Sequence, residues 1–231
     1  TEYIDGMRNI IQKLLDKKYA YIGADGSVYY AIRAFKNYGK LANITIGDLK
    51  DGGSGLVKKD EYSKEEAMDF ALWKSFEPAD GPNFWDVSFV IDGKPRIIRG
   101  RPGWHIECSA MSTAFLGDHF DLHLGGIDLV FPHHENEIAQ TEPATGKKFV
   151  NYWIHNEHLL VDNKKMSKSL GNFYTLRDIL AKGYSPLAFR YLMLSTHYRQ
   201  KINFTFESLD DSKNAIARLQ DFSYRMKDIM S

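Results

Sequence analysis

The sequence has a single cysteine, no long apolar run and no net charge. Because Cys108 is alone, no disulfide can form within the chain, and this suits a reducing cytosol. No apolar segment approaches the roughly 20 residues of a membrane span, and no secretory signal opens the chain, so we expect a cytoplasmic protein without a membrane partner. The 30 basic and 30 acidic residues balance, so binding to nucleic acid would need a local basic patch.

What is present fits a globular protein that continues beyond both ends of this chain. The 231 residues, 43% of them hydrophobic, suffice for a core in one large or two smaller domains. The chain opens at Thr1 rather than Met, already inside a helical pattern over residues 3–18 whose apolar positions recur at helical spacing. It ends inside a second helical pattern over residues 208–230. We interpret the chain as a fragment of a longer protein.

Two hairpins are predicted in the first hundred residues. Aromatic and β-branched residues flank Asp25-Gly26 and again Asp92-Gly93, and such pairs favour tight turns. The polar, glycine-rich stretch 47–66 predicts a loop, and residues 70–73 are compatible with either a helix or a buried strand. Residues 100–103 predict a turn that leads into a new segment.

From residue 104 onward, helical and extended patterns alternate. Helices are predicted over 104–115 and 132–140, and strands over 120–123 and 150–154, which favours a parallel α/β layer. Further helices are predicted over 175–182, 186–195 and 208–230, the first two with Thr175 and Ser185 as N-caps. The last has Leu209, Leu219 and Phe222 on an apolar side.

Three residues around Cys108 have the chemistry of metal ligands. His133 and Glu137 are four residues apart in a predicted helix and therefore face the same way. Cysteine, histidine and glutamate all bind zinc. A lone cysteine is nevertheless more often a buried apolar residue, and a His–Glu pair at this spacing is often a solvated pair, so spacing alone leaves both interpretations open.

Residues 165–169, Lys-Met-Ser-Lys-Ser, match the "KMSKS" signature of class I aminoacyl-tRNA synthetases. The alternative is a solvated basic loop. In the enzymatic interpretation, lysine ammonium groups stabilise the charge that builds on pyrophosphate as it leaves ATP, more in the transition state than in the ground state. Lys168 is the principal candidate and Lys165 the second.

Two longer stretches resemble the cysteinyl-tRNA synthetase family. Residues 103–111 (Gly-Trp-His-Ile-Glu-Cys-Ser-Ala-Met) and 131–140 (Phe-Pro-His-His-Glu-Asn-Glu-Ile-Ala-Gln) are similar to its signatures, in the same order. The resemblance implies one zinc per chain, bound by Cys108, His133 and Glu137. The family's fourth zinc ligand, a second cysteine, has no counterpart in this sequence. It also implies that Trp104 walls the cysteine pocket, although core packing is the alternative role for that side chain.

The same resemblance implies an ATP site and a set of partners. Gly125 and Asp128 follow a predicted strand, where glycine allows close approach of adenosine and the carboxylate can accept from ribose hydroxyls; a plain turn is the alternative. His105, His123 and His155 are candidates for lining the substrate cavity, and a structural role is the alternative for each. The expected substrates are L-cysteine, ATP with magnesium and tRNA(Cys), joined through a cysteinyl-adenylate, in a monomeric protein.

The "HIGH"-type motif of class I synthetases is absent from the sequence. The implied organisation is therefore a connective insertion (1–101), the second half of a Rossmann-type nucleotide fold (102–151) and a stem-contact region (152–231). The first half of that fold and an anticodon-binding domain are missing. Two other interpretations stay open: the related cysteine ligase of mycothiol biosynthesis, and an inactive fragment that only binds zinc or tRNA.

Overall fold

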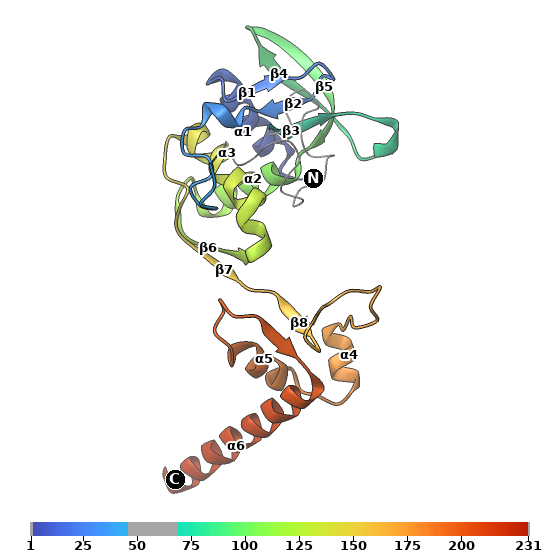
Figure 1. Ribbon diagram of the computed structural model, residues 1–231. Coiled ribbons are helices and arrows are strands. Elements are labelled where there is room, and N and C mark those ends of the chain that lie inside the picture. The colour runs from blue at the N-terminus through green and yellow to red at the C-terminus, as the bar shows by residue number, and fades with distance from the viewer. Residues whose placement is uncertain (1, 46–68, 231) are drawn as a thin grey trace. The chain divides into compact units, whose positions relative to one another are not determined.

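Residues 2–45 and 69–230, the part of the chain that the computed structural model describes, contain both helices and strands (Figure 1). The chain divides into two compact units. The first unit comprises residues 1–123 and 128–154, and the second comprises 124–127 and 155–231. The predicted mixed α/β class is confirmed. The predicted loop over 47–66 lies outside the described residues. None of the described helices is long and apolar enough to cross a membrane.

A five-stranded antiparallel sheet forms one side of the first unit, in the order β1-β2-β3-β5-β4. Its strands are β1 (Ala20–Ile22), β2 (Val28–Tyr30), β3 (Phe70–Ser75), β4 (Trp85–Ile91) and β5 (Lys94–Pro102). Short 3-10 turns, η1 (Ile32–Ala34) and η4 (Pro78–Asp80), interrupt the connections. Both predicted hairpins are confirmed, as β1–β2 and β4–β5. Residues 70–73 are strand, because all four side chains there are buried on the sheet.

The turn predicted over residues 100–103 is wrong, because β5 continues through Pro102 and pairs with β3. The glycines serve close backbone approach: a Cβ at Gly100 would lie 1.9 Å from the carbonyl oxygen of Lys74. Glycine is common in turns, but its role here is to let two strands and the following helix approach closely.

Helix α1 (Ile4–Asp16) packs against the sheet and contacts its edge strand β4. Its apolar stripe of Met7, Ile10, Ile11 and Leu14 is buried, as the periodicity predicts. On its polar side the Gln12 amide donates to the carbonyl oxygen of Val90 at 2.9 Å and accepts from the Val90 N–H at 2.8 Å. The edge strand β4 therefore has part of its free backbone satisfied by a side chain.

Two further helices pack with α1 and carry the candidate ligands. They are α2 (Trp104–Leu116) and α3 (Glu135–Thr145), and α3 is preceded by the turns η5 (Ile127–Leu129) and η6 (Val130–His134). Strands β6 (Phe120–Gly126) and β7 (Val150–Asn156) pair with each other. The helix predicted from Pro132 thus begins as the wide turn η6 and becomes regular at Glu135.

The second unit has its own small core. Strands β8 (Leu159–Val161), β9 (Lys164–Lys165) and β10 (Ile202–Phe204) form a sheet in which β8 and β10 are parallel. Helices α4 (Leu176–Ala181) and α5 (Pro186–Leu194) begin at Thr175 and Ser185, and each cap side chain accepts a backbone N–H, as predicted. Val161, Ile179, Leu192, Phe204 and Leu209 are buried together.

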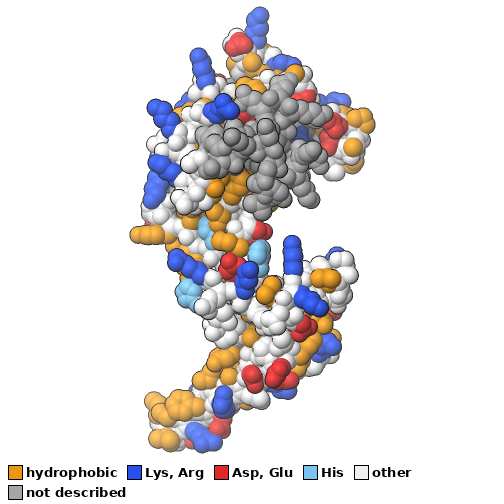
Figure 2. Space-filling view, viewed as in Figure 1, with side chains coloured by type: hydrophobic (Ala, Val, Ile, Leu, Met, Phe, Trp, Pro, Cys, Tyr) orange, Lys and Arg blue, Asp and Glu red, His pale blue; other side chains and the backbone are white. Residues whose placement is uncertain are grey.

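Helix α6 (Phe206–Met230) is 25 residues long. Only the start of its apolar side is buried, at Leu209, whereas Leu219, Phe222 and Met226 are exposed. Figure 2 shows hydrophobic side chains gathered at its C-terminal end. The periodicity predicted the apolar side correctly, but the described residues supply packing partners for its first turns alone.

Candidate functional site

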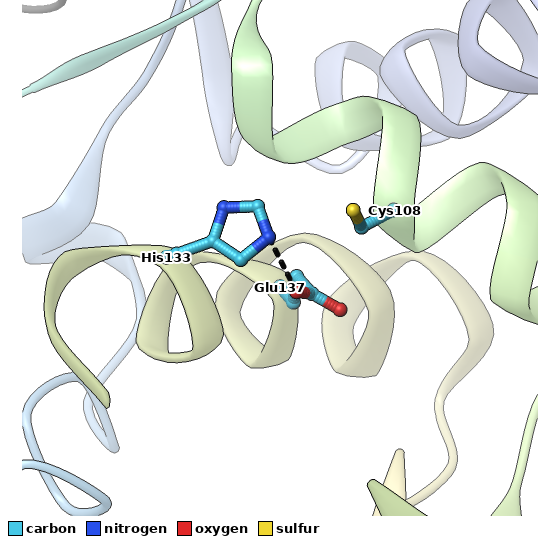
Figure 3. Close-up of side chains that lie close together, drawn as sticks. All are labelled: Cys108, His133 and Glu137. Atoms are coloured by element: carbon cyan, nitrogen blue, oxygen red, sulfur yellow. Dashed lines mark ion pairs between the residues drawn. The ribbon is translucent and has the colours of Figure 1, made fainter. Parts of the chain in front are cut away.

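Cys108, His133 and Glu137 meet between α2 and α3 (Figure 3). Cys108 lies on α2, His133 at the end of η6 and Glu137 in the first turns of α3. One ligand atom from each lies within 4.8 Å of the others. His133 Nε2 is 2.9 Å from Glu137 Oε1, so the predicted i, i+4 orientation is confirmed. The three residues selected from the sequence are brought together.

The electrostatics of this cluster favour a cation. Glu137 is fully buried, and neither of its carboxylate oxygens accepts a hydrogen bond of good geometry within the described residues. Burial lowers the pKa of His133, but contacts with Cys108 and Glu137 outweigh burial and raise that pKa to about 9. A buried carboxylate needs a positive partner. A proton on His133 provides one, and a metal ion that displaced this proton would provide another.

The donor set fits zinc. A soft thiolate, an imidazole nitrogen and one carboxylate oxygen are ligand types that tetrahedral zinc sites use. The fully buried Glu137 carboxylate, with His133 Nε2 2.9 Å from its Oε1, supplies the structural observation behind this match.

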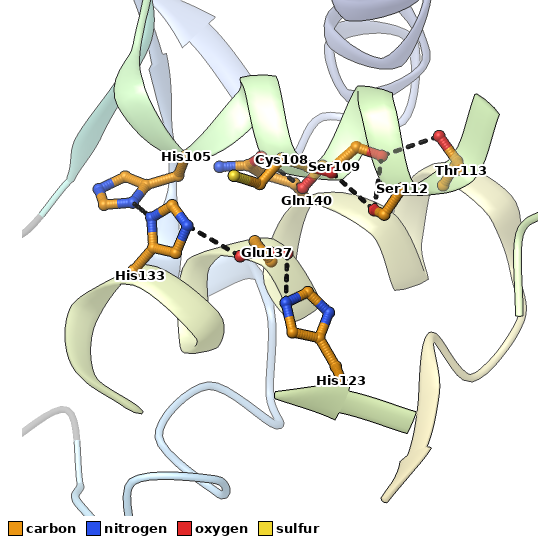
Figure 4. A network of polar contacts seen from close by, with 9 residues as sticks. All are labelled: His105, Cys108, Ser109, Ser112, Thr113, His123, His133, Glu137 and Gln140. Carbon is orange, nitrogen blue, oxygen red and sulfur yellow. Dashed lines mark hydrogen bonds and ion pairs between the residues drawn. The ribbon is translucent and has the colours of Figure 1, made fainter. Parts of the chain in front are cut away.

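Two of the histidines expected to line the cavity, His105 and His123, lie beside the cluster (Figure 4). His105 Nδ1 lies 2.9 Å from His133 Nδ1, and His123 Nε2 lies 3.7 Å from Glu137 Oε2. Burial, with a smaller contribution from His133, lowers the pKa of His105 to about 3. Burial also lowers the pKa of His123, although the Glu137 carboxylate opposes that shift. Both rings are therefore neutral near pH 7.

His134 and Trp153 were missed by sequence reasoning. The His134 ring centroid lies 4.7 Å from that of His123, and Trp153 stacks on His123 at 4.6 Å. His123, His134 and Glu137 form a second group whose ligand atoms also lie within 4.8 Å of one another. His155, which was expected in the same cavity, belongs to the second unit. The doubled histidine at 133–134 was the signal available in the sequence.

Trp104 stands at the start of α2 beside the cluster. Its ring centroid is 4.5 Å from that of His133, and 48% of its surface is exposed. Trp104 is therefore not enclosed in the core of the first unit.

Buried polar contacts hold α3 in place on its other sides. The Glu135 carboxylate accepts from the backbone N–H groups of Gly39 at 2.7 Å and Ala42 at 3.0 Å. Ser109 of α2 donates to the side-chain oxygen of Gln140 at 2.9 Å. These bonds fix the two ligand-bearing helices against each other and against the segment after η1.

The lysine segment is an ordered loop in the second unit. The Asn172 side chain accepts from the Ser167 N–H at 2.9 Å and donates to the carbonyl oxygen of Lys165 at 3.1 Å. Met166 packs against the core of that unit, while Lys165 and Lys168 are exposed. Gly171 has a φ of +65°, which a glycine adopts without strain. The Asn172 side chain thus connects two points of the loop, while Lys165 and Lys168 remain exposed and Lys168 Nζ lies 5.6 Å from the centroid of the Phe173 ring.

Gly125 and Asp128 lie in different elements, Gly125 in strand β6 and Asp128 in the turn η5 that follows it. Gly125 lies within that strand rather than after it, so the strand is longer than predicted. Asp128 is an exposed residue of the turn η5. Gly125 belongs to the second unit and Asp128 to the first.

Comparison with known proteins identifies the class. Residues 1–214 match the family model described as the tRNA synthetases class I (C) catalytic domain, and the chain belongs to that family. Curated relatives include the cysteine–tRNA ligase of Brachyspira hyodysenteriae, 56% identical over 99% of this chain and 46% of the relative. That of Protochlamydia amoebophila is 53% identical over 100% of this chain and 47% of the relative. The chain spans about half the length of these relatives.

A solved structure confirms the fold. Methionyl-tRNA synthetase of Mycobacterium tuberculosis in complex with methionyl-adenylate superposes with a TM-score of 0.56 at 11% identity, covering 93% of this chain and 50% of that one.

Proposed function

We propose that the protein containing this chain joins L-cysteine to tRNA(Cys) in an ATP-dependent reaction. The observation that carries the proposal is the group Cys108, His133 and Glu137, whose ligand atoms lie within 4.8 Å of one another around the fully buried Glu137 carboxylate. The curated relatives, which are named cysteine–tRNA ligases, support it. The names of these relatives favour a cysteine–tRNA ligase over the cysteine ligase of mycothiol biosynthesis.

Zinc held by Cys108, His133 and Glu137 would supply a soft Lewis acid that prefers the thiolate of cysteine to the hydroxyl of serine. Pocket size alone separates such near-isosteres poorly. The role of the three side chains is to present a thiolate, an imidazole nitrogen and a carboxylate oxygen in a water-poor site. Trp104 would form the wall against which the amino acid lies.

The first reaction step is adenylate formation. The carboxylate of cysteine attacks the α-phosphorus of ATP, which is bound with magnesium, and pyrophosphate leaves with the electron pair of the broken P–O bond. Lys168, and second Lys165, would neutralise charge on the leaving pyrophosphate. Gly125 and Asp128 would contact adenosine, the former by close backbone approach and the latter through the ribose hydroxyls.

The second step is transfer to tRNA. A hydroxyl of the terminal ribose attacks the carbonyl carbon of cysteinyl-adenylate, and AMP leaves. The charge balance of the chain gives no general affinity for nucleic acid, so recognition would depend on local basic side chains. The proposal also includes a monomeric, cytosolic protein. In it residues 1–101 form a connective insertion, 102–151 the second half of the nucleotide fold, and 152–231 the stem-contact region.

Cysteine-dependent ATP–pyrophosphate exchange tests the lysine assignment. Lys168→Ala should slow exchange about 100- to 1,000-fold, the usual loss on removing one transition-state contact, with cysteine affinity nearly unchanged. Lys147→Ala is the matched control, because Lys147 is an exposed lysine paired with Asp118 at 2.9 Å. A normal exchange rate in Lys168→Ala would refute the role of that residue.

Metal analysis tests the ligand assignment. Cys108→Ser should lose zinc and cysteine binding together. Ser112→Ala, one turn further along α2, is the control, since among the described residues the Ser112 hydroxyl donates to backbone oxygens of its own helix. Unchanged zinc content in Cys108→Ser would contradict the assignment. Exchange by a longer protein but not by residues 1–231 would favour the inactive-fragment interpretation for this chain alone.

A further inference from the structure

We propose that His105 is a positioning residue of the metal site: its Nδ1 accepts the Nδ1–H of His133 and so aims His133 Nε2 at Glu137 and Cys108. The inference rests on the proposed zinc site and deepens it. It concerns a residue that binds neither metal nor substrate but decides how a ligand is presented.

The geometry leaves one role for each nitrogen of His133. Its Nε2 lies 2.9 Å from Glu137 Oε1, on the side of the ligand cluster. Its Nδ1 lies 2.9 Å from His105 Nδ1, on the opposite side of the ring (Figure 4). The nitrogen that can reach a metal shared with Glu137 is therefore Nε2, and Nδ1 is the atom by which the ring is held.

Proton counting then fixes the direction of the contact between the two rings. Two ring nitrogens at hydrogen-bond distance share one proton, so one donates and the other accepts. An imidazole that binds a metal through Nε2 keeps its remaining proton on Nδ1. His133 must then be the donor, and His105 accepts at Nδ1 and carries its own proton at Nε2. Ligating histidines generally have such a partner for their second nitrogen.

His105 itself is held firmly enough to act in this way. Its side chain is only 2% exposed, and the ring of Phe70 from β3 meets it edge-on at a centroid distance of 5.6 Å. It precedes Cys108 by three residues on α2, so a single helix presents one ligand and orients another. His105 Nε2 is buried without a hydrogen-bond partner among the described residues, so no polar contact beyond His133 explains a histidine at this position.

Two substitutions separate positioning from simple packing. His105→Leu fills space but cannot accept a hydrogen bond, whereas the side-chain oxygen of His105→Asn can accept in place of Nδ1. Zinc dissociation constants of the full chain are measured by competition with a chromogenic chelator, and the thermal stability of the metal-free proteins is measured in parallel. We expect His105→Leu to weaken zinc binding about 10- to 100-fold and His105→Asn to restore most of the loss.

The order of the two variants is the decisive readout. A packing role predicts that the smaller, polar Asn is the worse replacement in both measurements, whereas a positioning role predicts that Leu is at least as stable without metal but binds zinc more weakly. Zinc affinity of His105→Leu within twofold of wild type, or no better affinity for Asn than for Leu, overturns the proposal. Wild-type protein that binds no zinc overturns the zinc assignment itself.

A measurement on the unmodified protein covers the case in which His105→Leu does not fold. Long-range nitrogen–proton NMR correlations of the zinc-loaded chain report the tautomer of each histidine. We expect the proton of His133 on Nδ1 and that of His105 on Nε2. A proton on Nδ1 of His105 would overturn the proposal without any substitution.

Discussion

Replacing Gly103 with alanine should destabilise the first unit although the backbone at that position suits any residue. Its φ and ψ are −67° and 160°, an ordinary extended conformation. The obstacle is space: a Cβ on Gly103 would lie 2.0 Å from the carbonyl oxygen of Ala71, where ordinary contacts begin at 3.4 Å. The chain must therefore move by more than one ångström at the point where β5 ends and α2 begins.

The magnitude follows from what that movement disturbs. The Gly103 N–H donates to the carbonyl oxygen of Leu72 at 2.9 Å, next to the pairing of Trp73 with Pro102. Overpacking a filled site costs about 1–3 kcal/mol, and the upper end applies because the obstructing atom belongs to a buried backbone rather than to a side chain that can turn. We expect the free energy of unfolding to fall by about 3 kcal/mol, and Tm by about 6–12 °C.

Gly6 provides a matched control for the same chemical change. It lies inside α1, and a Cβ there would meet Ala110 Cβ at 3.7 Å, an ordinary contact. Gly6→Ala should therefore raise the free energy of unfolding by about 0.5–1 kcal/mol, because alanine loses less backbone freedom in a helix.

Urea denaturation followed by far-ultraviolet circular dichroism measures both variants. The reasoning requires opposite signs for the same substitution at the two positions. A Gly103→Ala protein as stable as wild type would show that β3 and the start of α2 separate without cost. Because α2 carries Cys108, the same variant should also bind zinc less tightly, whereas Gly6→Ala should not.

Three further predictions concern caps and loops. Burial raises the pKa of Asp25, but hydrogen bonds led by the Ser27 N–H outweigh burial and hold that pKa below its usual range; Asp25→Asn should cost about 1 kcal/mol at pH 7 in urea denaturation. This stabilisation is present above the unfolded pKa of about 4 and is lost as pH falls below it, so the two proteins should converge in acid, and a constant difference would be contrary evidence. Ser185→Ala removes the N-cap bond to the Ala188 N–H at 3.1 Å and should lower the stability of the second unit by about 1 kcal/mol by the same measurement, whereas an unchanged midpoint would argue against the cap. Asn172→Ala removes the side-chain bonds that hold the lysine loop, and it should slow pyrophosphate exchange about tenfold with little change in Tm. A lower Tm with an unchanged exchange rate would show that Asn172 has a structural role alone.

Local spacing accounts for what could be predicted at the site. His133 and Glu137 face one way because residues four apart on a helix always do, so their side chains meet whatever the rest of the chain does. The buried stripe of α1 and the N-caps Thr175 and Ser185 follow from equally local rules. Where such a rule was applied to glycine alone, as at residues 100–103, it failed, because the reason for glycine lay on a strand distant in sequence.

The sequence by itself determined the chemistry of this protein: a thiol, an imidazole and a carboxylate in recognisable contexts, and a lysine loop with a glycine beyond it. The tertiary structure decided what surrounds them. His105 and His133 are 28 residues apart, and their contact exists because α2 packs on α3. The complete burial of the Glu137 side chain is likewise a property of packed layers. No periodicity encodes such contacts, because they depend on which surfaces of distant elements come together.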